Sequence, residues 1–187
     1  APGNTEFLSF PSVPLRQIVT YINKFSNNVM SRNLLLTLAA EHNGASAKPE
    51  QGVAVVQRWL NRQGLKLEAL NMINGAGLSR QAQLTARGLA DLLEHAYYSA
   101  FASELKSSLP LAGHDGSARR YFRDVSTKGK LRLKTGRLKH VRAIAGFAET
   151  PDNRNWIVVI LHHHRSTEPT AGFAVHENIV KWLYSQR

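Results

Sequence analysis

The last third of the chain departs from the helical pattern that precedes it. Three stretches, Leu131–Leu138, Val141–Glu149 and Asn155–His163, alternate apolar and polar side chains or are rich in β-branched residues, which is typical of strands. Pro151-Asp152-Asn153 has the composition of a turn, so the second and third strands should pair as an antiparallel hairpin. Helices, then an antiparallel sheet, then a final helix predict an α/β or α+β domain with helices packed on a sheet.

Helices are predicted wherever apolar residues recur at steps of three and four. The expected ranges are Pro14 to about Glu41, Pro49 to Gly64, Ser79 to about Ser103, and Val175–Tyr184. Ser26-Asn27-Asn28 interrupts the first range with small polar residues that compete for helix hydrogen bonds, so two helices with a kink between them are expected there. Ser79 is the predicted N-cap of the third range.

Composition excludes several kinds of site. The 187 residues contain no cysteine, which rules out disulfides, thiolate nucleophiles and cysteine-based zinc sites. No apolar run reaches the ~18 residues of a membrane span. Lys and Arg number 24 against 13 Asp and Glu, a net charge of +11, so the chain should be attracted to polyanions such as nucleic acid, anionic lipid or bacterial wall polymer.

The beginning of the chain is polar. Ala1-Pro2-Gly3-Asn4 is not a signal peptide, because no basic segment followed by an apolar one comes after it. We interpret the chain as a processed or truncated product, with an N-terminal extension over residues 1–12 and one domain over residues 13–187.

The first predicted strand contains Lys134-Thr135-Gly136, where a core strand would carry Val or Ile. Glycine on a strand lets a ligand or another backbone approach closely. A lysine and a hydroxyl beside that gap can bind a carboxylate, and the N–H groups of the strand can polarise a carbonyl laid alongside. The alternative is an edge strand with a solvated lysine and a bulge at the glycine.

Lys-Thr-Gly accompanies Ser-x-Asn and Ser-x-x-Lys in penicillin-recognising serine enzymes. Ser-x-Asn occurs at Ser26-Asn27-Asn28 and at Ser31-Arg32-Asn33, and the turn-like context favours the first. Ser-x-x-Lys occurs at Ser103-Glu104-Leu105-Lys106. The chemistry needs its serine on the first turn of a buried helix with the lysine one turn on. Ser103 is predicted at the other end of a helix, so it is not expected to be the nucleophile.

Five blocks in a fixed order carry a resemblance to one family. They are INKFSNNVMSRNLLL (22–36), GVAVVQRWLNRQGL (52–65), NGAGLSR (74–80), SSLPLAGHDGSARRYF (107–122) and RLKTGRLKHVRAIAGFAE (132–149). Together they resemble the class C, low-molecular-mass penicillin-binding proteins, the D-alanyl-D-alanine carboxypeptidase/endopeptidases of the bacterial periplasm. The resemblance implies the penicillin-binding, serine β-lactamase-like fold, an antiparallel sheet flanked by helices, and covers residues from about 12 to 187.

The chain departs from the family pattern at three points. Ile73 stands where an acid usually precedes Asn-Gly, and Asn27 is the middle residue of Ser-x-Asn where an acid is usual. In the family the Ser-x-x-Lys helix precedes Ser-x-Asn. The chain therefore resembles the C-terminal part of a catalytic domain, with an incomplete fold that lacks the helix of the nucleophile.

The resemblance implies roles for six residues. Ser26 would relay a proton to the leaving amine, Asn28 would bind the substrate's peptide carbonyl, and Lys134 would hold Ser26 and keep the site positive. Thr135 would bind the terminal D-Ala carboxylate beside Gly136, and the backbone N–H of Arg137 would form one arm of the oxyanion hole. No metal and no cofactor takes part in this chemistry.

Two other features suggest different chemistry. His162-His163-His164 invites a metal site, but neighbours on a strand point to opposite faces, so a strand end reaching solvent is favoured. Arg119, Arg120 and Arg123 with Tyr121 and Phe122 could stack on nucleic acid, or form a solvated basic segment. His114-Asp115 is adjacent in sequence and is interpreted as a turn rather than a catalytic pair.

The expected activity is hydrolysis of D-Ala-D-Ala or of cross-linked stem peptides in the periplasm, through a serine acyl-enzyme. The expected partners are peptidoglycan stem peptides, β-lactam antibiotics and the N-terminal portion of the same protein, without nucleic acid or a transmembrane segment. Without a nucleophile, the chain alone should be inactive. The alternatives are a non-catalytic wall-peptide-binding protein and a basic nucleic-acid-binding module.

Overall fold

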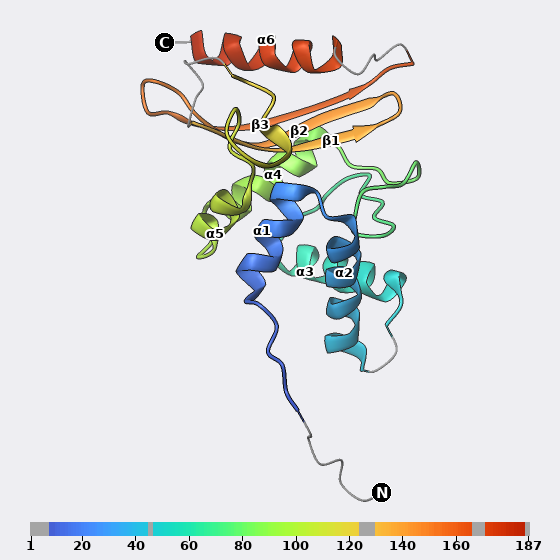
Figure 1. Ribbon diagram of the computed structural model, residues 1–187. Helices are drawn as coiled ribbons and strands as arrows, with labels where there is room; N and C mark the ends of the chain where they lie inside the picture. Colours follow the sequence, from blue (N-terminus) through green and yellow to red (C-terminus); the bar gives the residue numbers. More distant parts are fainter. Residues whose placement is uncertain (1–7, 45–46, 124–129, 166–170, 186–187) are drawn as a thin grey trace, which may run out of the picture.

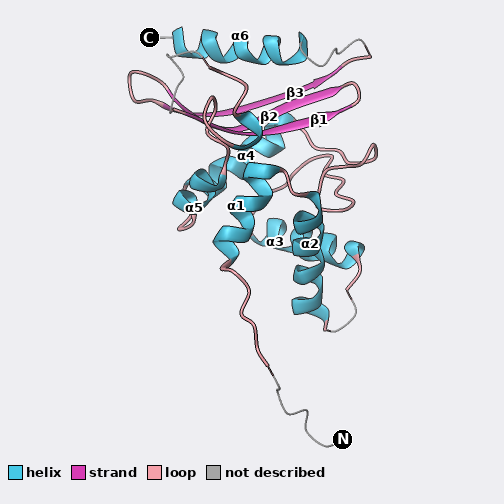
Figure 2. Cartoon of the chain, viewed as in Figure 1, coloured by secondary structure: helices cyan, strands magenta, loops and turns pink. Residues whose placement is uncertain are grey.

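The computed structural model describes residues 8–44, 47–123, 130–165 and 171–185, and these form three layers. A sheet lies between one helix, α6, on its upper face and α4 below it, and the remaining helices lie beyond α4 (Figure 1). Figure 2 shows that every strand belongs to this one sheet and that residues 8–14 run away from the helices. In order, the elements are α1 (Leu15–Phe25), α2 (Asn28–Asn43), α3 (Pro49–Arg62), α4 (Ala86–Tyr97), α5 (Ala102–Ser108), the short 3-10 helix η1 (Gly116–Ala118), β1 (Leu131–Leu138), β2 (Val141–Glu149), β3 (Asn155–His163) and α6 (Ala171–Ser185).

The sheet has the order β1-β2-β3 and is antiparallel throughout. All three strands have the bounds that the sequence predicts. In the register, Lys134 lies opposite Ala145, and Thr135 lies opposite Ile144. Successive residues therefore face α6 and α4 in turn, which decides the side on which each motif residue of β1 lies.

The two faces of the sheet bury separate apolar clusters. Leu131, Leu133 and Ile144 are fully buried on the face that α6 covers, together with Val180 of that helix. The opposite face packs Phe147 against Leu93 of α4. Strands of a sheet that is covered on both faces are mostly apolar, which explains why β2 and β3 carry so few charges.

The break between α1 and α2 confirms the predicted kink. Ser26 ends α1 in the left-handed conformation, with φ 52°, and the side chain of Asn27 accepts a hydrogen bond from the amide of Met30 as the N-cap of α2. A non-glycine residue rarely holds a positive φ unless its surroundings fix it. The turn is therefore held in place by its contacts.

The predicted long helix from Ser79 to Ser103 is wrong. The hydroxyl of Ser79 accepts from the amide of Gln81, two residues on, which makes a turn rather than a cap. The helix α4 begins only after Thr85, whose hydroxyl accepts from the amide of Gly88. Ser99 interrupts the pattern in the same manner, because its hydroxyl accepts from the amide of Phe101, and α5 follows as a separate helix.

α6 carries a buried histidine toward the sheet. His176 has no exposed surface, and its ring lies 6.0 Å from the ring of His162 on β3. Burial, followed by repulsion from His162 and the Arg142 guanidinium, lowers the pKa of His176 below its ordinary value. The neutral ring is therefore the form that the folded protein favours.

Acid should destabilise the protein through this residue. The pKa of His176 is lower in the folded state than the unfolded value of about 6.5. The contribution of neutral His176 to the free energy of unfolding is therefore complete above that pH, and it declines as the pH falls below it. The melting temperature should drop between pH 7.5 and pH 5, and His176→Leu should reduce that drop. The exposed His42 supplies the control, and a His42→Leu variant with an equally reduced drop would contradict the assignment.

Within the part of the chain that the structure describes, no helix combines the length and the hydropathy needed to cross a bilayer.

Candidate active site

A cleft of about 710 Å³ lies where the α1–α2 turn, the loop at residues 76–78, η1 and β1 meet. All six residues that the sequence singles out line it: Ser26, Asn28, Lys134, Thr135, Gly136 and Arg137. They come from two separate parts of the chain, the α1–α2 turn and β1. Their meeting in one cavity is what a shared substrate site requires.

The Ser-x-Asn and Lys-Thr-Gly motifs touch directly. Nζ of Lys134 donates to Oγ of Ser26 at 2.5 Å and to the carbonyl oxygen of Thr135 at 2.9 Å. Burial lowers the pKa of Lys134 from its ordinary value, because desolvation disfavours the charged ammonium. A lysine of lowered pKa can accept and return a proton nearer to neutral pH.

The left-handed turn decides which asparagine is available to a ligand. Both Asn27 and Asn28 line the cleft, but Asn27 uses its side-chain oxygen to cap α2, whereas Asn28 begins the helix and is exposed. An amide at this place can both donate to and accept from a bound peptide.

Ser117 joins the site although the sequence did not single it out. Its Oγ lies 2.9 Å from Oγ1 of Thr135, and it lines the same cleft from η1. Residue 117 lies inside one of the quoted family blocks, after Asp115-Gly116. A turn followed by a serine was the available signal, but a turn serine has no chemical meaning until its neighbours in space are known.

The outer edge of β1 borders the cleft. The carbonyl of Leu131 accepts from the amide of Ala112, and the amide of Leu133 donates to the carbonyl of Pro110, so residues 110–112 cover the first half of this edge. Thr135 and Arg137, two and four residues farther along, direct their backbone groups the same way. The amide of Arg137 is therefore placed to donate to a ligand lying along the strand.

Gly136 faces the neighbouring strand closely. A Cβ at this position would lie 3.3 Å from Cβ of Ala143 on β2. Two small residues therefore lie side by side on this part of the sheet, where both line the cleft.

The loop opposite β1 is fixed to α2. Oγ of Ser31 donates to the carbonyl of Gly75 at 2.6 Å, and Asn74 bonds with both Ala76 and Leu78. The second Ser-x-Asn occurrence thus anchors this wall through its serine, while the first places its own serine beside Lys134.

The Ser-x-x-Lys occurrence lies outside the cleft. Ser103 is on the first turn of α5 rather than at the end of a long helix, which corrects the predicted location, and its side chain is exposed. Nζ of Lys106 stands 4.0 Å over the ring of Tyr97. Neither residue lines the cleft, so the structure offers them no part in this site.

The histidine run gathers no metal-ligand cluster within the described residues, and the two aromatics of the arginine cluster pack inward. His162 faces α6 while His163 lies on the other face of β3 and lines a separate hollow, and among residues 8–44, 47–123, 130–165 and 171–185 no three metal-ligating side chains gather. Phe122 is buried, and the ring of Tyr121 stacks on Phe173 at 4.1 Å. Phe122 belongs to the core, whereas Tyr121 packs against the core and also lines the cleft at β1.

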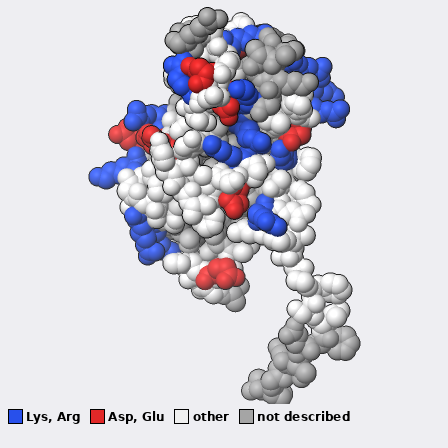
Figure 3. All heavy atoms as spheres, turned by 90° about the vertical axis from the view of Figure 1, so that its left-hand side faces the viewer, with Lys and Arg blue, Asp and Glu red and all other residues white. Residues whose placement is uncertain are grey.

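On one face of the molecule, basic residues are mixed with acidic ones. Figure 3 shows Lys and Arg interspersed with Asp and Glu on the face that it presents.

A wide hollow of about 870 Å³ lies between the end of α3 and α4, but its Arg87 and Asp91 pair with each other. The cleft at β1 is therefore the stronger candidate site, because it collects the reactive groups.

Comparison with known proteins identifies the family. The model of the D-Ala-D-Ala carboxypeptidase 3 (S13) family matches residues 2–186. The chain belongs to this family. The predicted resemblance to low-molecular-mass penicillin-binding proteins is thus confirmed.

Curated relatives are much longer than the chain. It is 28% identical over 165 residues to the D-alanyl-D-alanine carboxypeptidase of Actinomadura sp. (strain R39), covering 86% of this chain and 30% of the relative. The chain is also 28% identical over 138 residues to D-alanyl-D-alanine carboxypeptidase DacB of Haemophilus influenzae, and this match covers 73% of the chain and 29% of the relative. The chain therefore spans about three-tenths of the length of these S13 relatives.

Solved structures confirm the fold class. Penicillin-binding protein 4 (dacB) from Haemophilus influenzae superposes with a TM-score of 0.87 at 23% identity, over 94% of this chain and 41% of that one. Bd0816, a predatory endopeptidase of Bdellovibrio bacteriovorus solved with an immunity protein, superposes with a TM-score of 0.76 at 20% identity. The match covers 93% of this chain and 44% of that one. A β-lactamase from Chitinophaga pinensis gives 0.68 at 14% identity, over 92% and 64%. The fold is thus the penicillin-binding, β-lactamase-like one, present in part.

Proposed function

We propose that the chain provides the carboxylate-binding half of the active site of a periplasmic serine D-Ala-D-Ala carboxypeptidase or endopeptidase that acts on peptidoglycan stem peptides. The observation that carries this proposal is the hydrogen bond between Lys134 and Ser26, which joins two motifs 108 residues apart in the chain. The S13 family match supports the same reaction class.

In the proposed reaction the nucleophilic serine comes from outside the described residues. Its hydroxyl attacks the carbonyl of the penultimate D-Ala, the peptide bond breaks, and the amine of the terminal D-Ala leaves with the proton that Ser26 passes on. The amide of Arg137 stabilises the oxyanion. Water then hydrolyses the ester and restores the serine.

Thr135 and Lys134 give the site its preference for a free carboxylate. Oγ1 of Thr135 and Oγ of Ser117 lie 2.9 Å apart on the wall of the cleft, and the neighbouring Lys134 keeps the site positive. Asn28 holds the peptide carbonyl at the other wall. β-Lactams, which carry a carboxylate beside a reactive carbonyl, are the expected inhibitors.

The proposed partner of the chain is the N-terminal portion of the same protein. Large apolar side chains are exposed on α1, on α2 and beside α5, among them Phe25, Val29, Tyr98 and Phe101. Exposed apolar groups of this kind mark a surface that a further segment covers. The length of the relatives, of which the chain spans about three-tenths, supports that occupant.

Binding of N-acetyl-D-alanyl-D-alanine, measured by calorimetry or by NMR shifts, tests the proposal on the chain itself. Thr135→Val should weaken binding by about tenfold, because it removes a charge-assisted hydrogen bond to the carboxylate worth about 1.5 kcal/mol. Thr37→Val is the matched control, since Thr37 bonds only within its own helix, to the carbonyl of Asn33. Equal affinity of both variants would contradict the proposed role.

A non-catalytic wall-peptide-binding protein is the second candidate, because Ser103 and Lys106 lie outside the cleft. A fluorescent penicillin distinguishes the two. The chain alone should take up no covalent label, and label on Ser103 would overturn the present assignment. Label in protein that also contains the N-terminal portion would favour the enzyme.

A further inference from the structure

Three elements of the cleft are joined in a closed ring of side-chain contacts. β1 contacts the end of α1 through Lys134 and Ser26, and it contacts η1 through Thr135 and Ser117. The ring is closed by a third contact, where Nζ of Lys24 lies 2.5 Å from Oδ2 of Asp115. Each element thus touches both of the others.

We propose that the Lys24–Asp115 ion pair is a positioning clamp that sets the separation between Ser26 and the Thr135–Ser117 hydroxyl pair, and so aligns the proton relay with the carboxylate site. Lys24 is two residues before Ser26, and Asp115 is two residues before Ser117. Neither lines the cleft. They act through the residues they place, and the inference rests on the proposed function of that cleft.

The ion pair is built more firmly than a surface pair. The side chain of Lys24 is 14% exposed and that of Asp115 is 45% exposed, and Oδ1 of Asp115 also accepts from the amide of Leu111 at 2.7 Å. In the Arg87–Asp91 pair the two side chains are 87% and 35% exposed, so the difference between the pairs lies in the basic residue, which is mostly buried in one and mostly solvated in the other. Charge-assisted bonds held in partly buried, anchored groups restrict position far better than exposed pairs do.

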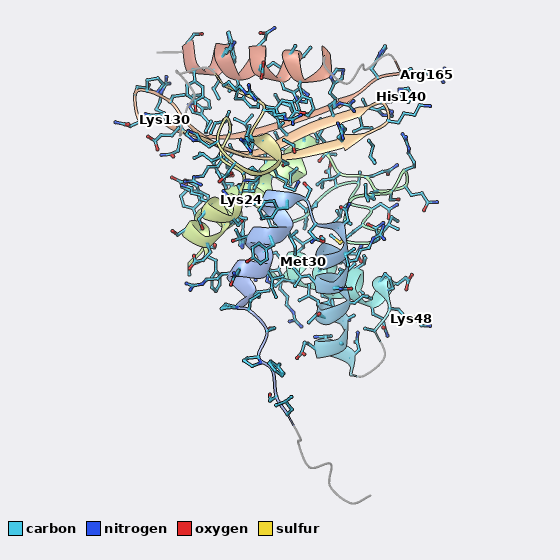
Figure 4. The ribbon with its side chains drawn as sticks, in the orientation of Figure 1. Lys24, Met30, Lys48, Lys130, His140 and Arg165 are labelled. Carbon is cyan, nitrogen blue, oxygen red and sulfur yellow. The ribbon has the colours of Figure 1, made fainter. Side chains whose placement is uncertain are left out.

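The backbones meet at the same point. A Cβ on Gly116 would lie 2.5 Å from the carbonyl oxygen of Lys24, so only glycine allows this approach. One residue earlier in α1, Nδ2 of Asn23 donates to Oγ of Ser108 at 2.8 Å. The last turn of α1 (Lys24 is labelled in Figure 4) is therefore docked on the segment 108–117 by two side chains and one backbone contact.

The clamp matters because the conformation of Ser26 depends on its surroundings. Its φ of 52° is one that a serine adopts at a cost of about 1 kcal/mol or more unless its surroundings fix it. Without the ion pair, the turn can relax, and the hydroxyl of Ser26 moves away from Lys134. A displacement of about 1 Å can cost a large factor in a reaction that depends on alignment.

Asp115→Asn tests the clamp, since it removes the charge and keeps an oxygen for the Leu111 amide. Lys24→Met is the second variant. Lys24→Arg should retain the affinity of the parent protein, because arginine keeps the positive charge on a side chain of similar length. Asp91→Asn, which breaks the exposed pair on α4, is the matched control. Melting temperatures establish that each variant is folded.

Two measurements are made on the 187-residue chain. Affinity for N-acetyl-D-alanyl-D-alanine should fall about tenfold in Asp115→Asn and Lys24→Met, and it should stay within about twofold of the parent protein in Lys24→Arg and Asp91→Asn. Amide hydrogen exchange should rise about tenfold at residues 24–28 and 115–118 in the first two variants only, with α3 unchanged.

The exchange measurement keeps the clamp separate from the proposed function. If the parent chain does not bind the dipeptide, the proposed function fails, and exchange at residues 24–28 still decides whether the ion pair fixes the turn. Unchanged exchange there in Asp115→Asn overturns the clamp. Loss of affinity in Lys24→Arg as large as in Lys24→Met also overturns it, because a charge-based clamp must tolerate arginine.

Discussion

Lys134→Met should slow acylation by a fluorescent penicillin by about 10²–10⁴-fold, the usual contribution of a positioned proton-transfer group. The measurement uses the chain together with the N-terminal portion that is proposed to supply the nucleophile. Nζ of Lys134 lies 2.5 Å from Oγ of Ser26, and methionine keeps the length of the side chain while removing the proton carrier and the charge. The covalent labelling rate, followed by gel fluorescence, reports the loss.

Lys134→Arg separates the two contributions of this residue. Arginine keeps the positive charge but does not give up its proton near neutral pH, whereas burial lowers the pKa of Lys134 from its ordinary value. A rate as slow as that of Lys134→Met indicates proton transfer, and a rate near that of the parent indicates charge alone. Lys130→Met, at the start of the same hairpin, removes a partly exposed lysine paired with Glu149 and should leave the rate within about twofold. An unaltered rate in Lys134→Met would contradict the proposed site.

Gly146→Ala should destabilise the fold by about 3 kcal/mol or more, a large loss for one methyl group. A Cβ at this position would lie 2.1 Å from the carbonyl oxygen of Arg132 on β1, and Gly146 pairs with Leu133 in the centre of the sheet. The obstruction is backbone, so a rotamer change cannot relieve it, and the two strands must separate. Urea denaturation followed by circular dichroism measures the change.

Gly44→Ala is the matched control for this prediction. Gly44 has a φ of 82° and nothing within 4 Å of the added carbon, so only backbone strain of about 1 kcal/mol is expected. A loss in Gly146→Ala no larger than the loss in Gly44→Ala would show that the strands tolerate the added methyl.

The strands and the broken first helix were predictable because local composition decides them. Alternating apolar residues with a Pro-Asp-Asn turn specify a hairpin whatever packs against it, and a run of Ser, Asn and Asn carries its own capping groups. The helix from Ser79 to Ser103 was not predictable in this way. Its apolar spacing is real, but the hydroxyls of Ser79, Thr85 and Ser99 bond to nearby amides and divide the segment into turns and shorter helices.

Local sequence patterns identify the residue types and their immediate setting: a serine and an asparagine at a helix break, and a lysine, a threonine and a glycine on a strand. The contact between Ser26 and Lys134, the pairing of Ser117 with Thr135 and the exclusion of Ser103 from the cleft become visible in the folded chain. The physical reason is the distance along the chain over which each kind of interaction acts. Capping and periodicity act within a few residues along the chain, whereas a catalytic cleft depends on distances between elements that are far apart in sequence and are fixed by packing on both faces of the sheet.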